Sequence, residues 1–571
     1  MKSFQEKKVQ VWRIRTILII AFILIAILAA RLFQVQVLQY KKYSTLAEKQ
    51  HLLQKEIPAK RGQVFVKEKD DQKFPIAVNV KRYLIYAVPQ RITKDDDLAS
   101  KISPIIDMPA DKIKEMFSDK KKVYVTIKHD LSDEQAKKIE DLNFEGIGLT
   151  PEEKRYYPEG SLASHILGFV NNEGKGQYGI EGYFNEQLSG KTGMLETEKD
   201  VEGNPIFLDV NSNKPASNGD DIVLTIDRSI QYKVEDILKK GVEKHGADSG
   251  SVIVIEPQTG KILAMANYPN FDPNKFGEVE NFDIFKNESI ASVWEPGSIY
   301  KVITMAAGLN EGKVTPDSTY DDTGNVERDG YNIKNSDKSA NGTQTMTQVL
   351  EKSLNTGAIY VKDKTGNETF YNYLKNFGFG VMTGIELEGE GKGDIKPIEN
   401  WTEVGFATAS FGQGIAITPL QMVTAFGAIA NSGKMMKPQI IDEVIHPDGK
   451  TEKIEPKMVK QVISPQAASL LGGMMVNVVE RGHGTQAGVT GYYIAGKTGT
   501  AQIPLPGGQG YDPNHTIGSF AGFGPVENPK FVMLVKIDKP RDVIWAESSA
   551  APIFGEIAQV LLNYYQIPPS R

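Results

Sequence analysis

Three short motifs follow one another along this chain, and together they describe serine acyl-transfer chemistry. They are Ser298-Ile299-Tyr300-Lys301, Ser353-Leu354-Asn355 and Lys497-Thr498-Gly499-Thr500. A serine becomes a nucleophile when a neighbouring base takes its proton, and a lysine can serve as that base where no histidine is available. Each motif alone has an ordinary structural explanation, so the prediction depends on their order and local context.

The first motif predicts a nucleophile, Ser298, with Lys301 as its base. Ser298 follows the turn signal Trp294–Gly297, and the apolar run after it predicts a helix that begins at the serine. Lys301 lies one turn further on the same face, where burial and the positive helix end both disfavour its charge. The N–H of Ser298 is a candidate oxyanion-hole donor. Alone, the motif more commonly marks a serine helix cap with a solvated lysine.

The second motif can carry a proton relay. The hydroxyl of Ser353 and the amide of Asn355 can face one cleft from a turn. The hydroxyl then passes a proton between a leaving amine and a lysine, while the amide holds a substrate peptide group. Alone, this motif more commonly marks a turn at a helix end.

The third motif is expected to bind a substrate carboxylate through Lys497, Thr498 and Thr500. The N–H of Thr500 is the second candidate oxyanion donor. The β-prone run Tyr492–Ala495 predicts an edge strand that pairs with the substrate backbone, and Gly499 is expected to let that substrate approach closely.

Other copies of the same letters fail on context. They lie at Ser118–Lys121, Ser339–Asn341, Lys191–Gly193 and Lys364–Gly366. The first is flanked by charges, the second lies in a polar loop, and the glycine of the last is placed to end a helix.

A phosphate-binding loop is the competing interpretation of the third motif. Gly491–Thr498 matches the pattern G-x4-G-K-[ST] letter for letter. Such a loop needs a helix directly after it, but bulky strand formers fill the loop positions and Pro504 and Pro506 follow. We therefore favour the strand.

Composition narrows the classes of function. The 571 residues predict two or three domains, and the net charge of −6 argues against a nucleic-acid partner. Cysteine is absent and the seven histidines show no ligand spacing, so no metal or other cofactor is predicted.

The amino-terminal region predicts a single-pass membrane anchor. Ile17–Ala30 is uninterruptedly apolar, with Arg13 and Arg15 before it and Arg31 after it. Thr16, Leu32 and Phe33 extend the run towards the roughly 30 Å of a hydrocarbon core. A cleaved signal peptide is the alternative, but the small residues that cleavage requires are not suitably spaced. The short basic tail is expected inside and the rest outside.

Between the anchor and the three motifs, the pattern predicts a mixed segment. Residues 33–57 predict a helical stalk, Val64–Val66, Leu84–Val88 and Val123–Ile127 predict strands, and Asp133–Leu142 predicts a helix. The polar stretch Asn211–Asn218 predicts a domain boundary.

The carboxy-terminal segment begins and ends with strand signals and is helical between them, which predicts an antiparallel sheet packed by helices, an α+β domain. Predicted strands are Asp221–Ile226, Ser251–Glu256, Lys261–Ala266, Tyr492–Ala495, Ser519–Phe523 and Phe531–Ile537; predicted helices are Ser229–Gly241 and Ala551–Tyr564, with helical stretches over most of 298–430.

The three motifs resemble the active site of the penicillin-recognising serine transpeptidases. Segments that extend this resemblance are Trp294–Ser298, Phe411–Gly414, Thr418–Gln421 and Ser519–Phe523. Arg61-Gly62, Arg155–Pro158 and Gly179–Gly182 resemble the pedestal of class B penicillin-binding proteins, and Ala407–Gly412 resembles their cell-division and sporulation branch. Ile299 departs from the family, which usually has threonine after the nucleophile.

The resemblance implies a domain plan of the α+β class. It places a cytoplasmic tail at 1–15, a transmembrane anchor at 16–33, an elongated pedestal of the dimerisation type at 34–215, a transpeptidase domain related to serine β-lactamases at 216–566, and a tail at 567–571. The protein is thus expected in a bacterial cell membrane with its catalytic domain outside.

The resemblance also implies a reaction. Ser298 would attack the penultimate carbonyl of a D-Ala-D-Ala stem peptide, Ser353 would protonate the departing D-Ala, and an amine of a second stem peptide would complete the cross-link. β-Lactams would acylate Ser298. A SEDS-family glycosyltransferase and division proteins are the implied partners. Two alternatives remain, a D,D-carboxypeptidase or β-lactamase-like hydrolase and a non-catalytic scaffold or sensor.

Overall fold

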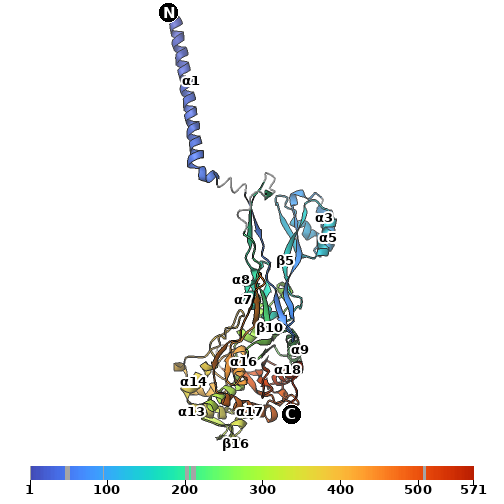
Figure 1. The fold of residues 1–571 in the computed structure, drawn as a ribbon, viewed down its shortest axis with the longest axis vertical. Helices are drawn as coiled ribbons and strands as arrows, with labels where there is room; N and C mark the ends of the chain where they lie inside the picture. The colour runs from blue at the N-terminus through green and yellow to red at the C-terminus, as the bar shows by residue number, and fades with distance from the viewer. Residues whose placement is uncertain (1, 45–51, 94, 200–204, 207–213, 506–509) are drawn as a thin grey trace. The chain divides into compact units, whose positions relative to one another are not determined.

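The computed structural model describes residues 2–44, 52–93, 95–199, 205–206, 214–505 and 510–571. The chain divides into two compact units. One contains Met1–Lys60 and Gly190–Asn218, and the other contains Arg61–Ser189 and Gly219–Arg571. Figure 1 shows the ribbon coloured along the chain.

The first unit consists of a long helix and a small sheet. Helix α1 spans Lys2–Phe33 and a π-helical turn follows at Gln34–Leu38. The stretch Val11–Leu38 is long and apolar enough to cross a membrane, and it contains the predicted span of 16–33. The sheet has the order β1-β8-β9, formed by Leu52–Ile57, Gly193–Lys199 and Pro205–Ile206.

The prediction of a helical stalk over 33–57 is wrong at its carboxyl end. Leu52–Ile57 pairs with β8 in an antiparallel ladder, from Leu52 opposite Glu198 to Ile57 opposite Gly193. The residues of β1 have a modest helix preference, which the ladder's hydrogen bonds outweigh. Residues 45–51 of the predicted stalk, and 211–213 of the predicted boundary, lie outside the described residues.

The second unit contains a seven-stranded sheet with the order β19-β18-β10-β2-β3-β4, in which β5 also pairs with β3. These strands are β2 Val64–Lys67, β3 Lys73–Ala87, β4 Val125–Leu131, β5 Ile147–Tyr156, β10 Asp221–Asp227, β18 Ile441–Ile445 and β19 Thr451–Lys453. Strand β10, which follows the predicted boundary, runs parallel to β2, which precedes it. The strands predicted at Val64–Val66, Leu84–Val88 and Val123–Ile127 are confirmed in type.

A small core joins one end of this sheet to three helices. They are α3 Asp95–Ile106, α4 Ala110–Met116 and α5 Asp133–Asp141. Helix α5, which confirms the prediction for Asp133–Leu142, begins with a capping box between Ser132 and Gln135.

Three segments that resemble the pedestal meet around one buried carboxylate. Glu181, in α7 (Gly179–Tyr183), is fully buried. Its carboxylate lies 2.6 Å from Nη2 of Arg61 and 2.6 Å from Nε of Arg155. Arg155 also donates to the backbone oxygen of Gly62 at 2.7 Å. We call Arg61, Arg155 and Glu181 the Glu181 cluster.

A five-stranded antiparallel sheet forms the centre of the carboxy-terminal part. Its order is β12-β11-β23-β22-β21. The strands are β11 Ser249–Ile255, β12 Ile262–Tyr268, β21 Ala495–Pro504, β22 Tyr511–Gly524 and β23 Phe531–Asp538. Strand β21 lies at the edge of this sheet, as its motif predicts.

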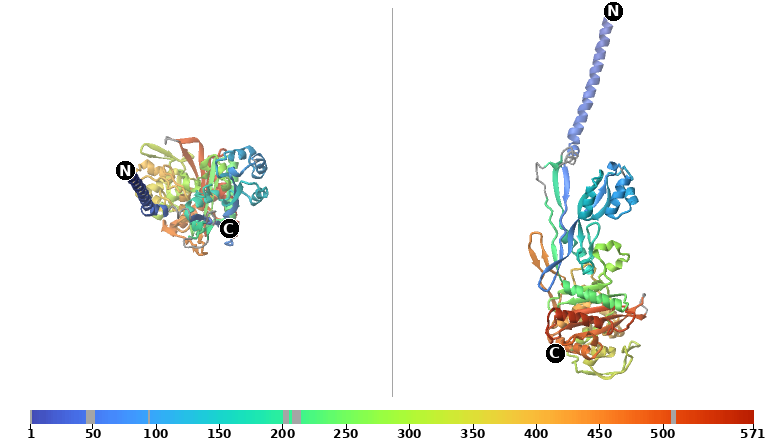
Figure 2. Two further views of the ribbon diagram at one scale, coloured as in Figure 1. Left: turned by 90° about the horizontal axis from the view of Figure 1, so that it is seen from above. Right: turned by 90° about the vertical axis from the view of Figure 1, so that its right-hand side faces the viewer.

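Helices cover both faces of this sheet, which confirms the predicted α+β class. Alternate residues of each strand face opposite sides, so Val252 and Val254 pack with α9 and α18 while Ile253 and Ile255 pack with α11, α16 and α17. Helices α9 (Arg228–Lys244) and α18 (Ala550–Tyr564) lie next to one another in the views of Figures 1 and 2.

The second unit also contains further helices, short strands and 3-10 turns. They are α6 Ser164–Leu167, β6 Phe169–Val170, β7 Gly176–Gln177, α8 Asn185–Ser189, α10 Glu288–Ala291, α11 Lys301–Asn310, β13 Thr319–Asp322, β14 Asn325–Arg328, β15 Tyr331–Lys334, β16 Gly342–Thr345, α12 Met346–Glu351, α13 Asn355–Thr365, α14 Asn367–Asn376, α15 Glu403–Ala409, α16 Pro419–Ala430, β17 Lys434–Met436, β20 Met458–Gln461 and α17 Pro465–Arg481, with 3-10 turns at Pro89–Arg91, Pro273–Glu278, Phe282–Phe285, Gly297–Tyr300, Ile398–Asn400 and Thr485–Ala487.

The strand predicted at Tyr492–Ala495 is wrong in position. Tyr492 closes a turn through its N–H to the carbonyl of Val489 at 3.1 Å, and β21 begins only at Ala495. The buried ring of Tyr492 belongs to the core beneath α18, and its hydroxyl donates to the carbonyl of Ile567 at 2.6 Å. The β-prone composition therefore serves core packing here.

Candidate active site

The first motif lies where a 3-10 turn passes into a buried helix. The turn covers Gly297–Tyr300 and leads directly into α11, in which all residues except Asn310 are buried. Gly297 has a φ of +59° and donates its N–H to the carbonyl of Gly412 at 3.0 Å, which fixes the approach to Ser298. Ser298 itself remains partly exposed and lines a cavity of about 360 Å³.

Lys301 is buried one turn beyond Ser298, with 1% of its surface exposed. Its Nζ donates to the backbone oxygen of Ser353 and, at 3.2 Å, to the Ser353 hydroxyl. Burial, and then the charge of Lys497, hold the pKa of Lys301 well below its usual range. The neutral amine that proton abstraction requires is therefore favoured.

Ser353 lies between the two buried lysines of the motifs. It has a φ of +57° at the junction of α12 and α13, a conformation that side chains rarely adopt. Its Oγ lies 3.2 Å from Nζ of Lys301 and 3.0 Å from Nζ of Lys497. The strained backbone thus holds one hydroxyl within reach of both amines, which is the geometry of a proton relay.

Lys497 is the second buried amine, with 0% of its surface exposed. Besides Ser353, its Nζ donates to the carbonyl and hydroxyl of Thr498, at 3.2 and 3.3 Å. Burial lowers its pKa to about 7, although the charge of Glu547 acts in the opposite direction. A bound carboxylate would complete the partners of this ammonium.

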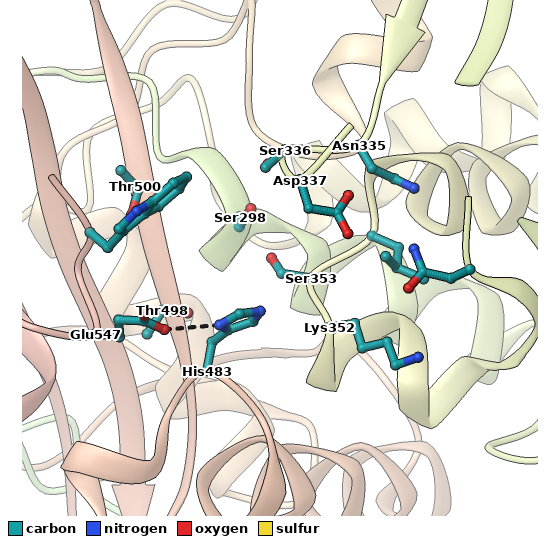
Figure 3. Close-up of a pocket in the computed structure, with 13 residues that line it drawn as sticks. Ser298, Asn335, Ser336, Asp337, Lys352, Ser353, His483, Thr498, Thr500 and Glu547 are labelled. Atoms are coloured by element: carbon teal, nitrogen blue, oxygen red, sulfur yellow. Dashed lines mark hydrogen bonds and ion pairs between the residues drawn. The ribbon is translucent and has the colours of Figure 1, made fainter. Parts of the chain in front are cut away.

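The edge strand presents Thr498 and Thr500 to the same cavity. The hydroxyl of Thr500 accepts the N–H of Ala546 at 3.1 Å, so its proton is still available for a ligand. Figure 3 shows these threonines on one side of the cavity and the hydroxyls of Ser298 and Ser353 at its centre.

Gly499 makes a close contact inside the protein that the motif did not predict. A Cβ at this position would lie 2.9 Å from the carbonyl oxygen of Pro296 and 3.0 Å from Cγ2 of Ile299. The missing side chain therefore lets β21 pass close to the nucleophile's turn. Ile299 is fully buried in that contact.

Asn355 borders the cavity on its other side. It begins α13 and donates its side-chain N–H to the carbonyl of Lys334 at 2.9 Å. It lines an adjoining hollow together with Ser298 and Thr500. Seven of the eight predicted site residues thus come from two helix starts and one strand edge around a single opening, and the eighth, Gly499, faces the protein interior.

Comparisons with known proteins agree with this geometry. A family model described as "Penicillin binding protein transpeptidase domain" matches residues 250–559, and one described as "Penicillin-binding Protein dimerisation domain" matches residues 56–224. The chain is 32% identical to stage V sporulation protein D of Bacillus subtilis over 98% of this chain and 86% of that protein. It is 31% identical to the peptidoglycan D,D-transpeptidase FtsI of Buchnera aphidicola over 100% of this chain and 99% of that protein.

This chain is a class B penicillin-binding protein. A solved structure also supports the assignment. Penicillin-binding protein 3 of Mycobacterium tuberculosis, complexed with aztreonam, has a TM-score of 0.71 and 27% identity over 90% of this chain and 98% of that one.

Three of the four other copies of the motif letters do not line the active-site cavity. Ser118 is exposed and its hydroxyl donates only to the carbonyl of Glu115, at 2.7 Å. Lys191–Gly193 belongs to the first compact unit. Gly366, with a φ of +89°, ends α13 as expected. The phosphate-loop alternative is wrong, because Lys497 and Thr498 lie within strand β21, which continues to Pro504 where a phosphate loop would begin a helix.

The cavity also contains residues that the motifs did not reveal. Asn341, from the copy taken for a polar loop, does lie in a loop, but it borders the cavity and donates to the carboxylate of Asp322 at 2.8 Å. His483 and Glu547 line the opposite side with Trp545. His483 follows α17 and Glu547 precedes α18, so nothing in their spacing along the chain connects them to the motifs.

Proposed function

We propose that this penicillin-binding protein is a serine-type peptidoglycan D,D-transpeptidase. The observation that carries the proposal is the Ser353 hydroxyl, which lies within hydrogen-bond distance of two buried amines beside the partly exposed Ser298. A neutral amine, a relay and an exposed hydroxyl are what acylation of a serine without histidine requires.

In the proposed reaction, Lys301 takes the proton of Ser298 as its oxygen attacks the penultimate carbonyl of a D-Ala-D-Ala stem. The backbone N–H groups of Ser298 and Thr500 stabilise the oxyanion. Ser353 delivers a proton to the leaving D-Ala, whose carboxylate binds Lys497, Thr498 and Thr500. Asn355 holds the donor peptide, and an acceptor amine then releases Ser298 by forming the cross-link.

The full-length relatives support a wider assignment. The two relatives named above are called a sporulation protein and a peptidoglycan transpeptidase FtsI, which supports a role in septal wall synthesis. Helix α1 would anchor the chain once in a bacterial membrane, with the five basic residues before the apolar run inside and the second unit outside. A SEDS-family glycosyltransferase and division proteins would be its partners.

Intact-protein mass spectrometry of the full chain in detergent tests the proposal. Benzylpenicillin should add one molecule per chain, stable for hours, and Ser298→Ala should abolish the adduct. Ser118→Ala, in the exposed copy of the motif, is the matched control and should retain it. Absence of an adduct on folded wild-type protein would refute the serine mechanism, and an adduct lost within minutes would favour the hydrolase alternative.

A further inference from the structure

One ion pair in the cavity takes no part in the transpeptidation steps proposed above. Nδ1 of His483 lies 2.9 Å from Oε2 of Glu547, and both side chains line the cavity with Ser298, Ser353 and Thr498. The backbone N–H of His483 donates to the backbone carbonyl of Glu351 at 3.4 Å. This bond holds the backbone of His483 at the end of α12.

Among the described residues, the pair engages only Nδ1 of the imidazole, so Nε2 can act as a base. The carboxylate of Glu547 can only accept a hydrogen bond, so Nδ1 carries the proton and Nε2 retains its lone pair. Figure 3 shows the ring below Ser353, between Thr498 and Lys352, with Glu547 at its other edge. The other nitrogen therefore faces away from Glu547, on the side of Ser353 and Lys352.

The cross-linking step needs a base that acylation does not use. An acceptor arrives as an alkylammonium ion, which has no lone pair and cannot attack the ester on Ser298. It must lose one proton before attack and a second as the amide forms. Ser298 Oγ takes the second proton, through Ser353 and Lys301, when the bond between its oxygen and the acyl carbon breaks. Because Lys301 and Ser353 carry the second proton in this scheme, a separate group is needed to take the first.

We propose, resting on the transpeptidase assignment, that His483 takes this first proton from the acceptor ammonium and that Glu547 orients the ring and stabilises the imidazolium. The acceptor nitrogen then forms its bond to the acyl carbon, Ser298 regains its hydroxyl, and His483 returns the proton to solvent. Glu547 also supplies a negative charge that attracts the incoming cation.

The charges that face His483 are consistent with this role. Lys497 lies behind Thr498, and Lys352 and Asp337 line the cavity opposite. Arg481, at the end of α17, pairs with Glu351 at 3.6 Å. Glu547 holds the ring in position and stabilises the positive charge once the proton is transferred.

Partition of the acyl-enzyme between amine and water tests the proposal. An acyl-D-alanyl thioester donor would load Ser298, and D-alanine or hydroxylamine would compete with water for the acyl group. D-Alanine is an ammonium ion at pH 7, whereas hydroxylamine is already neutral and needs no base. In His483→Gln, the ratio of D-alanine product to hydrolysis should fall roughly 10²-fold, while the hydroxylamine ratio stays within about threefold. Glu547→Gln should lower the D-alanine ratio about tenfold.

A second histidine–carboxylate pair in the same chain provides the control. Nδ1 of His446 lies 3.0 Å from Oδ1 of Asp220, outside the cavity, and His446→Gln should leave both ratios at the wild-type value. Equal losses with D-alanine and hydroxylamine, or no loss with either, would overturn the role of His483. Adduct formation with benzylpenicillin tests the serine mechanism separately, because that step involves no acceptor.

Discussion

Two regions of this protein bury cations, and they treat them in opposite ways. In the sheet that contains β2 and β18, Lys67 donates to Asp442 and, at 3.0 Å, to Glu443, and these bonds raise its pKa although burial lowers it. In the active site, Lys301 and Lys497 are buried more completely, and their hydrogen-bond partners are the neutral groups of Ser353 and Thr498. Their pKa values fall.

The difference shows what turns a buried lysine into a base. Burial penalises the charged amine in both regions, and an adjacent carboxylate decides the outcome. Where carboxylates are present the cation is structural, and where only hydroxyls and carbonyls are present the amine can accept a proton. The Glu181 cluster follows the structural pattern, with one carboxylate between two arginines.

Removing the base should produce the largest effect. In Lys301→Met, benzylpenicillin should acylate Ser298 roughly 10²–10⁴-fold more slowly, because the amine that takes the serine proton is lost. Lys301→Arg should be equally slow, since a guanidinium stays charged even when it is buried. Quenched-flow acylation followed by mass spectrometry measures both.

Lys364→Met, in the exposed copy of the Lys-Thr-Gly motif, should acylate at the wild-type rate. Rapid acylation of Lys301→Arg would show that position 301 acts through its charge and not as a base. The contrast between the two cation regions would then lose its mechanistic meaning.

Removing the carboxylate of the Glu181 cluster should lower the unfolding free energy by about 3–5 kcal/mol. Glu181→Gln leaves Arg61 and Arg155 without their counter-charge, and Arg155 is only 7% exposed. Chemical denaturation of the full chain in detergent measures the loss. Glu186→Gln, at an exposed position one helix further on, should change stability by less than about 0.5 kcal/mol.

The sequence predicted the site more fully than it predicted the fold around it. Order and context placed Ser298, Ser353 and Lys497 in one cleft, and the structure brings them together. The same reasoning did not find the internal contact of Gly499, because a missing side chain does not indicate which neighbour fills the space. The contact with Pro296 and Ile299 joins segments that are about 200 residues apart, and only the fold reveals it.

The other predictions that the structure corrects also depended on contacts between distant parts of the chain. Leu52–Ile57 and Tyr492–Ala495 were assigned from local preference, but a strand partner decides the first and core packing decides the second. His483 and Glu547 lie on different elements, so no spacing along the chain could indicate their contact. Motifs of the pedestal were recognised singly, whereas their meeting at Glu181 depends on β2, β5 and α7 folding together.

Two matched substitutions, one in each region, should change the unfolding free energy in opposite directions. Lys67→Met should lower the unfolding free energy by about 1–3 kcal/mol, because Glu443 and Asp442 lose a partner and keep only Lys73 and Lys261. Lys497→Met should raise it by a similar amount, because a buried amine without a carboxylate partner is replaced by an apolar side chain of similar length. The second substitution should also weaken acylation by carboxylate-bearing donors.

The pH dependence of these two stability changes distinguishes a buried amine that resists its charge from a lysine that is stabilised by carboxylates. The folded pKa of Lys497 is about 7 against an ordinary value of 10.5, so the folded state resists a proton that the unfolded chain binds. This penalty is complete below pH 7, shrinks between 7 and 10.5, and is absent above. The stability gained in Lys497→Met should therefore be largest near pH 6 and vanish above pH 10.5.

The folded pKa of Lys67 is raised, so its contribution to stability is complete below pH 10.5 and the loss in Lys67→Met should be constant from pH 6 to 9. Thermal unfolding of both variants across this range measures the difference, and a pH-independent loss of stability in Lys497→Met would mean that Lys497 is a charged structural residue like Lys67.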